Sequence, residues 1–448
     1  MINTFVGNFG HLSTLIAFVS AVVTAFAYSQ YFKANELDKP SWRRFSRVSF
    51  YVHAVATLLI AGSLFEIIYH QRYEYFYAFS HSSKALPVHY MISSFWEGQE
   101  GAFILWAFWN VVLGLFLVHS NKFWEAPVMV VFALVQAFLI SMILGVVVGD
   151  LKIGSSPFIL LRDATQAPIF EVNPDFIPED GTGLNPLLQN IWMVIHPPTL
   201  FLGYASTLVP FAFLIAGLVT KRYGEWIRPA LPWAIFSAMI LGMGIIMGAY
   251  WAYVTLNFGG YWNWDPVENA VYVPWLILVA SIHTMITFKK SATALKTSIV
   301  LVILSFILVL YATFLVRSGV LGDASVHSFT DLGLSGQLLI YLLFFMAVAI
   351  FLAVRAWKHI PSSPKEASIY SREFWIFLGA ITLSLMAFQV ILPTSIPAWN
   401  TLVESFGGIS NRAPNGNPIK YYTNAQVVCA IVIALLTAVG QFFWWQNI

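Results

Sequence analysis

Long apolar runs separated by short polar connections dominate this chain of 448 residues. A helix needs about 20 predominantly apolar residues to cross the hydrocarbon core of a bilayer. About eleven runs approach that length, over residues 9–32, 46–69, 101–120, 127–149, 192–219, 231–249, 271–288, 297–316, 336–356, 373–393 and 424–445. Because lipid offers backbone groups no hydrogen-bonding partner, such runs are expected to be helical. The pattern predicts an all-α, polytopic integral membrane protein with about 11 transmembrane helices.

Basic residues in the connections predict the orientation. One set of alternate connections carries 16 of the 23 lysines and arginines, and the other set carries 7. Lys and Arg are enriched in cytoplasmic connections, so the N-terminus is predicted outside and the C-terminus in the cytoplasm. The loops 70–100, 150–190 and 394–423 then lie outside, where we expect them to form a roof that binds partners. The first run lacks a cleavage site and is interpreted as an uncleaved span.

Composition agrees with a membrane protein and excludes several functions. Hydrophobic residues make up 58% of the chain and charged residues 10%, which excludes a water-soluble globule. The net charge of +2 gives no indication of a nucleic-acid partner. Cys429 is the single cysteine, so the chain has no disulfide, CxxC pair or covalent haem site of its own. We find no internal repeat and predict one membrane domain, 1–448.

The outer connection between the sixth and seventh spans is dense in aromatic residues. It contains NFGGYWNWDPVENA, residues 257–270. Seven of the fifteen residues from 250 to 264 are aromatic, namely Tyr250, Trp251, Tyr253, Phe258, Tyr261, Trp262 and Trp264. Interfacial belts normally scatter their rings, so this density favours a surface for a large flat ligand over a simple Trp/Tyr belt. Gly259 and Gly260 would let the backbone approach such a ligand closely.

Three of the ten histidines are candidate ligands because of where the topology puts them. His196 is predicted at the outer mouth of the fifth span, and His327 in the outer loop beyond the eighth. Two imidazoles on either side of a flat macrocycle would hold an iron porphyrin. His283 is predicted about 18 Å below the outer end of the seventh span, within the membrane. The alternative for each is an ordinary histidine, in a loop or hydrogen-bonded to a neighbouring helix.

Three segments carry a resemblance to a known family. They are LNPLLQNIWMVIHPPTLFLGY (184–204), GAYWAYVTLNFGGYWNWDPVENAVYVPWL (248–276) and ATFLVRSGVLGDASVHSF (312–329). Together they resemble the cytochrome c-type biogenesis protein CcmF family, in the haem-handling superfamily that also contains CcsA. The middle segment resembles its Trp-rich WWD signature, and SFWEGQEGAFILW (94–106) also fits. The resemblance runs through most of residues 1 to about 390.

The resemblance implies a cytochrome c haem lyase in the bacterial inner membrane. Such an enzyme joins haem vinyl groups to the two thiols of a CxxCH motif in apocytochrome c, at an active site facing the periplasm. The implied haem-handling core covers residues 184–335 and includes the WWD segment 248–276. Implied partners are apocytochrome c, a haem donor or chaperone, and subunits that reduce its thiols or present the apocytochrome.

The same resemblance implies the residues that bind haem. The ligands of the external substrate haem fall on His196 and His327, and a ligand of an intramembrane haem b falls on His283. The WWD segment, expected to lie against the external haem, falls on Trp251, Gly259, Gly260, Trp262, Trp264, Asp265, Pro266, Glu268 and Asn269. Where many relatives have WGGWW this chain has FGGYW, so Phe258 and Tyr261 replace tryptophans and haem contact is expected to persist.

Charged residues near this segment have separate expected roles. Arg317, at the outer end of the eighth span, would pair with a haem propionate through its guanidinium fork, or snorkel at the interface. Asp265 and Glu268 would repel propionates. We therefore predict that they are structural, with Asp265 as the N-cap of a helix that begins near Pro266.

The C-terminal part of the family pattern, including the second ligand of the intramembrane haem, is not found in the sequence. Three explanations stay open: the chain is a fragment, a second subunit supplies the ligand, or an internal histidine such as His53 substitutes. A function other than ligation also stays open, because a haem transporter or chaperone could use the same aromatic plate and ligands. A quinol-linked b-type electron carrier would need two paired intramembrane histidines. The number of spans, the FLVRSGVL segment and His283 favour the lyase.

Overall fold

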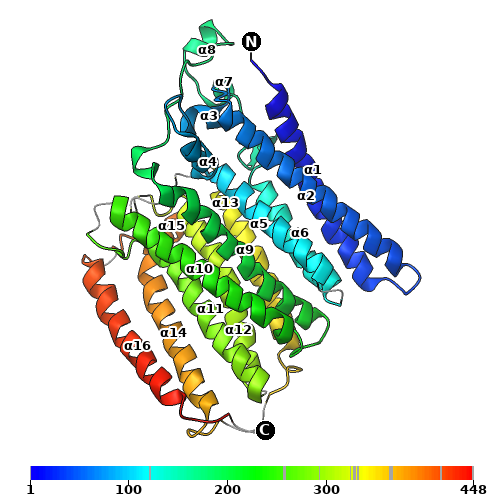
Figure 1. Ribbon diagram of the computed structural model, residues 1–448, viewed down its shortest axis with the longest axis vertical. Coiled ribbons are helices and arrows are strands. Elements are labelled where there is room, and N and C mark those ends of the chain that lie inside the picture. The colour runs from blue at the N-terminus through cyan, green and yellow to red at the C-terminus, as the bar shows by residue number, and fades with distance from the viewer. Residues whose placement is uncertain are drawn as a thin grey trace. The chain divides into compact units, whose positions relative to one another are not determined.

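The structure is a computed structural model that describes residues 2–120, 123–255, 259–291, 293–322, 324–325, 329, 332–362, 367–413 and 416–445. Within these ranges ten helices are long and apolar enough to cross a membrane (Figure 1). They are α1 Phe5–Lys33, α2 Lys39–Tyr69, α5 Gln99–Ser120, α9 Ile191–Val219, α10 Ile227–Thr255, α11 Pro266–Ser291, α12 Leu295–Arg317, α13 Ser335–Ala356, α14 Arg372–Thr394 and α16 Pro418–Gly440. The prediction of an all-α polytopic membrane protein is confirmed, and the orientation of the termini stays a prediction.

Shorter elements connect these helices. They are α3 Phe76–His81, α4 Val88–Glu97, α6 Glu125–Ser141, β1 Val146–Val148, β2 Leu151–Ile153, α7 Leu161–Ala164, α8 Ile169–Val172, the 3₁₀ turn η1 Pro186–Leu188 and α15 Ile396–Ser405.

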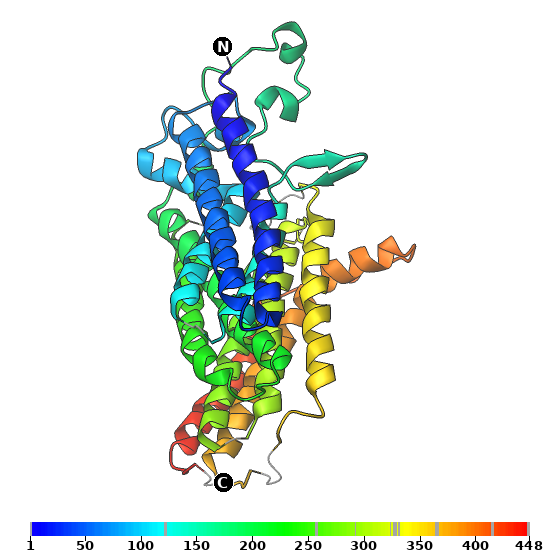
Figure 2. The same cartoon turned by 90° about the vertical axis from the view of Figure 1, so that its right-hand side faces the viewer.

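The fourth apolar run differs from its prediction. We expected a span over residues 127–149, whereas α6 ends at Ser141 and the run continues into the antiparallel hairpin β1–β2. Gly145, with a φ of 60°, turns the chain between them, and the three valines of β1 are β-branched residues that favour a strand. Figure 2 shows this hairpin as the two arrows that project to one side. With 17 residues, α6 is near the lower limit for a span, about 26 Å.

The chain separates into two compact units whose boundary falls within α9. The first unit contains residues 1–205 and 254–257, and the second contains residues 206–253 and 258–448. His196 belongs to the first unit, and the WWD loop, residues 259–265, belongs to the second. The predicted haem-handling core of residues 184–335 therefore draws residues from both units.

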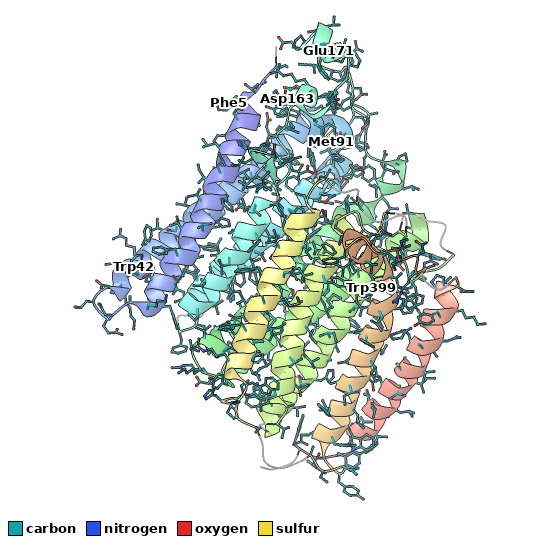
Figure 3. All side chains as sticks on the ribbon, turned by 180° about the vertical axis from the view of Figure 1, so that it is seen from behind. Phe5, Trp42, Met91, Asp163, Glu171 and Trp399 are labelled. Atoms are coloured by element: carbon teal, nitrogen blue, oxygen red, sulfur yellow. The ribbon has the colours of Figure 1, made fainter. Side chains whose placement is uncertain are left out.

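The first unit is built on the antiparallel pair α1 and α2, against which α5 and α6 pack. The buried face of α1 is made of small residues at helical spacing: Gly7, Gly10, Thr14, Ala17, Ala21 and Thr24. Small residues let two helix backbones approach closely when lipid supplies no hydrophobic driving force. Figure 3 shows Trp42 at one end of this pair, and Met91 and Asp163 near the other.

At the end of the α1–α2 pair near Met91 and Asp163, two loop segments are hydrogen-bonded to each other and form a layer. Residues 74–76 pair with residues 159–161 through backbone hydrogen bonds of 2.8 and 3.0 Å. The hydroxyl of Tyr75 accepts from the amide of Gly7 at 2.9 Å and donates to the carbonyl of Asn3 at 2.6 Å. Burial raises the pKa of this phenol, which keeps it neutral and able to donate. The layer is thereby fixed to the start of α1.

In the second unit α11 is the central helix. It packs against α12 and α14, and α14 packs in turn against α16. Apolar residues that include Val273, Leu276 and Met386 form its core around α11. A second cluster near the start of α11 contains Ala270 and Leu315. These contacts fix the start of α11, where the WWD loop enters the helix.

Candidate functional site

The WWD loop ends in a capping box at the start of α11. The carboxylate of Asp265 accepts from the amide of Val267 at 2.9 Å, and its carbonyl accepts from the amide of Asn269 at 2.9 Å. Glu268, three residues on, accepts at 3.0 Å from the amides of Asp265 and Asn263. This reciprocal arrangement satisfies amides that a helix start leaves unpaired. The predicted N-cap role of Asp265 is confirmed, and Glu268 has a structural role as well.

Trp264 lies immediately before the cap in a strained backbone conformation. Its φ is 57°, in the left-handed region that non-glycine residues seldom adopt. Its indole N–H donates to the hydroxyl of Thr423 on α16 at 3.0 Å, and its ring stacks on Tyr422 with centroids 5.2 Å apart. Asn269, only 1% exposed, donates to the Trp264 carbonyl and to Thr394. The amide of Asn269 therefore fixes the loop, and its predicted contact with haem stays a prediction.

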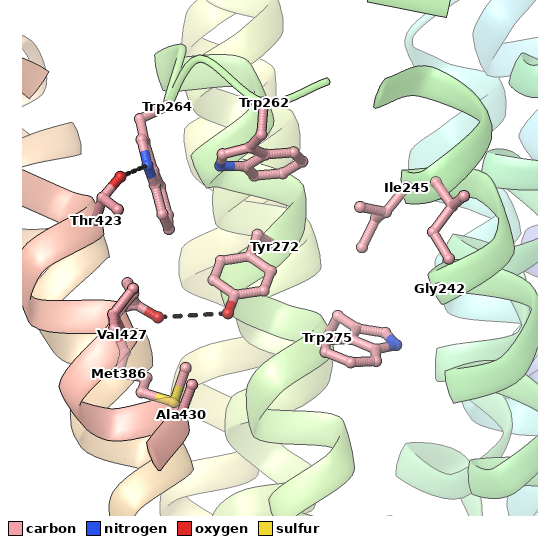
Figure 4. A pocket seen from close by; sticks show the side chains of 12 residues that line it. Gly242, Ile245, Trp262, Trp264, Tyr272, Trp275, Met386, Thr423, Val427 and Ala430 are labelled. Carbon is pink, nitrogen blue, oxygen red and sulfur yellow. Dashed lines mark hydrogen bonds between the residues drawn. The ribbon is translucent and has the colours of Figure 1, made fainter. Parts of the chain in front are cut away.

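An apolar pocket of about 460 Å³ lies between the WWD loop and helices α10, α11, α14 and α16 (Figure 4). Its twelve lining residues are Gly242, Ile245 and Ile246 of α10, Trp262 and Trp264 of the loop, Tyr272 and Trp275 of α11, Met386 of α14, and Thr423, Gln426, Val427 and Ala430 of α16. All belong to the second unit. The pocket reaches to Trp275, about 14 Å along α11 from its start. Its size falls within the range of small-molecule sites.

Four rings form one wall of this pocket, which we call the aromatic wall: Trp262, Trp264, Tyr272 and Trp275. Neighbouring centroids lie 5.7 to 6.2 Å apart. Tyr272 donates to Gln426 at 3.3 Å and Trp275 to the carbonyl of Ala238 at 2.9 Å. The buried indole nitrogen of Trp262, by contrast, has no hydrogen-bond partner within the described part of the chain. Buried indole N–H groups usually find a partner, so this donor suits an acceptor on a bound ligand.

The start of the loop lies apart from the pocket lining. Tyr261 stacks on Tyr253 with centroids 4.2 Å apart and planes 13° apart. Gly259 has a φ of 75°, which favours glycine, and no heavy atom of the described residues lies within 4 Å of the position of a Cβ at Gly259 or Gly260. Open space beside both glycines is compatible with the predicted close approach of a ligand. Trp251 is partly buried near the end of α10.

Arg317 is the last residue of α12 and is 7% exposed. Its guanidinium lies over the ring of Phe329, 4.5 Å from the centroid. The Phe329 amide donates to the carbonyl of Val316 at 3.1 Å, and Ser325 donates to Asp265 at 2.7 Å. His327 itself lies outside the described residues. Residues on either side of it are thus fixed to the end of α12 and to the cap of α11.

The remaining candidate histidines lie in different surroundings. His196 is in the second turn of α9, which begins at Ile191, and is partly buried. His283 is about 26 Å along α11 from Pro266. It is exposed, and its Nδ1 contacts the carbonyl of Val279 at 2.8 Å. An Nδ1–H donor to a carbonyl leaves Nε2 as the lone-pair nitrogen, as in histidines that bind metals.

His53 has the opposite arrangement. It is 1% exposed in α2, with Nδ1 2.8 Å from the carbonyl of Ala17 and Nε2 2.9 Å from the amide nitrogen of Gln136. Gln136 also donates to the carbonyl of Ala107 at 3.0 Å. Both nitrogens of the His53 ring are therefore engaged within the first unit. This geometry favours a helix-linking role for His53 over substitution as a haem ligand.

Several pocket residues lay outside our sequence predictions. Tyr272 and Trp275 follow the WWD loop at helical spacing, so the periodicity of α11 puts them on one face. Thr423 and Gln426 are also three residues apart, and polar residues in an apolar span indicate specific contacts. Our prediction began the last span at residue 424, whereas α16 begins at Pro418. The capping side chain of Asn417, which accepts from the amide of Lys420, accounts for the earlier start.

These features define a class of protein: a polytopic membrane protein with an aromatic-walled apolar pocket suited to a flat ligand. A family model described as cytochrome C assembly protein matches residues 96–321, just over half of the chain. The chain belongs to the cytochrome c assembly protein family.

Similar proteins agree with this assignment. The chain is 33% identical over 401 residues to the cytochrome c-type biogenesis protein CcmF of Haemophilus influenzae, covering 88% of this chain and 57% of that protein. It is 35% identical over 374 residues to CcmF of Pseudomonas fluorescens, covering 83% and 52% respectively. The chain thus spans about half the length of these curated relatives.

A solved structure has the same fold. The structure titled cytochrome c haem lyase CcmF superposes with a TM-score of 0.74 at 21% sequence identity. The superposition covers 100% of this chain and 63% of that chain.

Replacing the cap tests how the loop is fixed. Asp265→Ala removes the acceptors for Val267 and Ser325 and is expected to destabilise the start of α11 by about 1 kcal/mol. Hydrogen exchange of the amides at 267–269 should then quicken roughly fivefold. Asp265→Asn is the matched control, because an asparagine oxygen caps equally well. Equal exchange rates in both variants would contradict the capping role.

Proposed function

We propose that this chain positions haem for thioether attachment to apocytochrome c, as part of a cytochrome c haem lyase. The observation that carries the proposal is the aromatic wall with the indole N–H of Trp262, for which the described residues provide no acceptor. Membership of the cytochrome c assembly family supports haem as the ligand. A porphyrin is flat, apolar over its faces and polar at its propionates, so ring contacts and one donor suit it.

In this proposal the substrate haem lies at the outer membrane face with an apolar face against the rings of Trp262 and Trp264. His196 and His327 are its iron ligands, and Trp251, Tyr261, Gly259 and Gly260 line its surroundings. Asn269 acts mainly by fixing the loop, as its contacts with Trp264 and Thr394 suggest. Arg317 is the candidate partner for a propionate, since it lies near the fixed flanks of His327.

The chemistry asked of the chain is positioning. Each thiol of the CxxCH motif adds across a vinyl C=C bond: a carbon–sulfur bond forms, and the thiol proton ends on the neighbouring vinyl carbon. No net oxidation occurs in that addition. A site that holds the vinyl edge beside the thiols can contribute several kcal/mol by orientation alone. A strained loop fixed by the capping box would keep the rings in place during the addition.

A second haem, of b type, is proposed within the membrane with His283 as one ligand. The orientation of its Nδ1 toward the Val279 carbonyl leaves Nε2 for iron. When bound, this haem would transfer electrons to the external iron. The exposure of His283 suits a second ligand from a further polypeptide segment or subunit outside the described helices, since both His53 nitrogens are already engaged.

The proposed location is the bacterial inner membrane, with the site facing the periplasm. The proposed partners are apocytochrome c, a haem donor or chaperone, and subunits that reduce the apocytochrome thiols or present the apocytochrome. The lipid bilayer is a further proposed partner, because many apolar side chains of the long helices are exposed and would contact lipid.

Trp262→Ala tests the lyase proposal in cells that contain the chain and its partners. We expect covalent haem on a reporter cytochrome to fall about tenfold, because one ring contact is worth about 1.4 kcal/mol. Haem staining after denaturing electrophoresis measures this product. Trp444→Ala, beyond the end of α16 on the predicted cytoplasmic side, is the matched control, since Trp444 is exposed and outside the pocket. Haem that reaches the reporter but is lost on denaturation would instead indicate a carrier.

His283→Ala tests the intramembrane haem separately. We expect purified protein in detergent to lose this haem, quantified as the reduced pyridine adduct. His53→Ala is the control: it should retain the haem yet unfold at lower temperature, because a buried amide and a carbonyl lose their partner at about 1–3 kcal/mol each. Unchanged haem content in His283→Ala would contradict the assignment.

A further inference from the structure

A basic cavity lies at the end of the first unit where α1 and α2 are connected. Its volume is about 540 Å³, and it is lined by Tyr31, Lys39, Pro40, Arg43, Arg44, Arg47, Val48 and Tyr51. We call it the basic cavity. It is in the first unit and shares no lining residue with the aromatic pocket. The distribution of Lys and Arg predicts that this end faces the cytoplasm.

A buried carboxylate holds two of the arginines in place. Glu125, whose side chain is fully buried, accepts from Arg43 at 3.0 Å and from Arg47 at 2.7 and 2.8 Å. Tyr28 donates to the same carboxylate at 3.3 Å. Arg47 also donates to the carbonyl of Val118 at 3.0 Å. Paired in this way, the two guanidinium groups are held at the rim, where their side chains are 33% and 25% exposed.

The charges of the cavity do not balance. One carboxylate serves both Arg43 and Arg47. Lys39 pairs with Glu36, whose side chain is 88% exposed, and such surface pairs are weak. For Arg44 the described residues provide no ion-pair partner. With Asp38, the residue before Lys39, four cations stand beside three carboxylates, and the surplus of one positive charge favours an anionic occupant.

The start of α2 adds to this preference. Lys39 is its first residue, and its first turn contains no acidic residue. Asp38, at the capping position, makes no side-chain cap and instead accepts from Asn35 at 2.9 Å. The Asp38 carboxylate therefore makes no cap hydrogen bond to the amides at the start of α2. Guanidinium groups at the same point suit the oxygens of a phosphate.

An exposed apolar stripe continues from the cavity along α2. Val48 lines the cavity, and Val52, Val55 and Leu59 follow at intervals of four, three and four residues. These side chains are 41% to 55% exposed. Positions at this spacing lie on one helix face. A ligand with a phosphate at the cavity and an acyl chain along the stripe would contact both features.

We propose that the basic cavity binds the headgroup of one anionic phospholipid, such as phosphatidylglycerol or cardiolipin, with an acyl chain along the Val48–Leu59 stripe. Basic pockets between helices on the cytoplasmic side suit such headgroups. The stripe distinguishes a lipid from free phosphate, because phosphate has no part to cover it. Binding at this place would tie the α1–α2 connection to the inner leaflet.

The test compares lipid retention in two matched double variants. Lys39→Gln/Arg44→Gln removes two cations of the cavity and leaves the Glu125 cluster intact. Lys289→Gln/Lys290→Gln removes two exposed cations at the end of α11 in the second unit. Native mass spectrometry of detergent-purified protein titrated with phosphatidylglycerol measures the affinity. We expect the first variant to bind about 30-fold more weakly and the second to bind as wild type does.

Three results would overturn the proposal. If the cavity variant binds lipid as tightly as the wild type, the basic cavity is not the binding site. If both double variants lose affinity equally, the lipid is attracted by general surface charge. Complete displacement of lipid by millimolar inorganic phosphate, with no gain from acyl chains over glycerol phosphate, would make it a free-anion site. Equal thermal midpoints of both variants and wild type in lipid-free detergent would show that the fold is intact.

Discussion

The capping box at the start of α11 is the constraint on which the candidate site depends. Asp265 and Glu268 satisfy the amides of the helix start and of the WWD loop, so the loop enters the helix in one conformation. That conformation requires Trp264 to adopt a positive φ. Contacts with Thr423, Tyr422 and Asn269 hold it there. Polar groups thereby orient the rings, and the rings form the apolar wall.

Hydrogen-bond partners also distinguish the two histidines of the long apolar helices, His53 and His283. His53 has both ring nitrogens engaged between helices of the first unit, whereas His283 is exposed and is bonded at Nδ1, which leaves Nε2 as its lone-pair nitrogen. A polar atom at membrane depth needs a partner. The first arrangement supports packing, and the second suits a ligand from outside the described helices. Both residues lie within apolar runs of the sequence, so only their neighbours in the structure distinguish them.

Sequence predicted the helical membrane fold because apolar length and lipid burial together permit little else. It also predicted the Asp265 cap, since DPVE is a local signal of a helix start. The predicted span was wrong at residues 142–149. Gly145 turns the chain there, within an apolar run whose composition is the same as that of a helix. The sequence did not predict the pocket. Its lining includes Thr423 and Gln426, which lie more than 140 residues from the loop in the sequence. The partnering of His53 depends equally on distant residues, Ala17 and Gln136.

The most direct test of the central claim is to fill the pocket. In protein carrying His283→Ala, to remove the proposed intramembrane haem, Ala430→Trp would occupy the pocket beside the aromatic wall. Ala434→Trp, one turn further along α16 and outside the lining, is the matched control. Titration with haem, followed by absorbance, should show binding in the control and its loss in Ala430→Trp. Equal haem binding in both proteins would contradict the account.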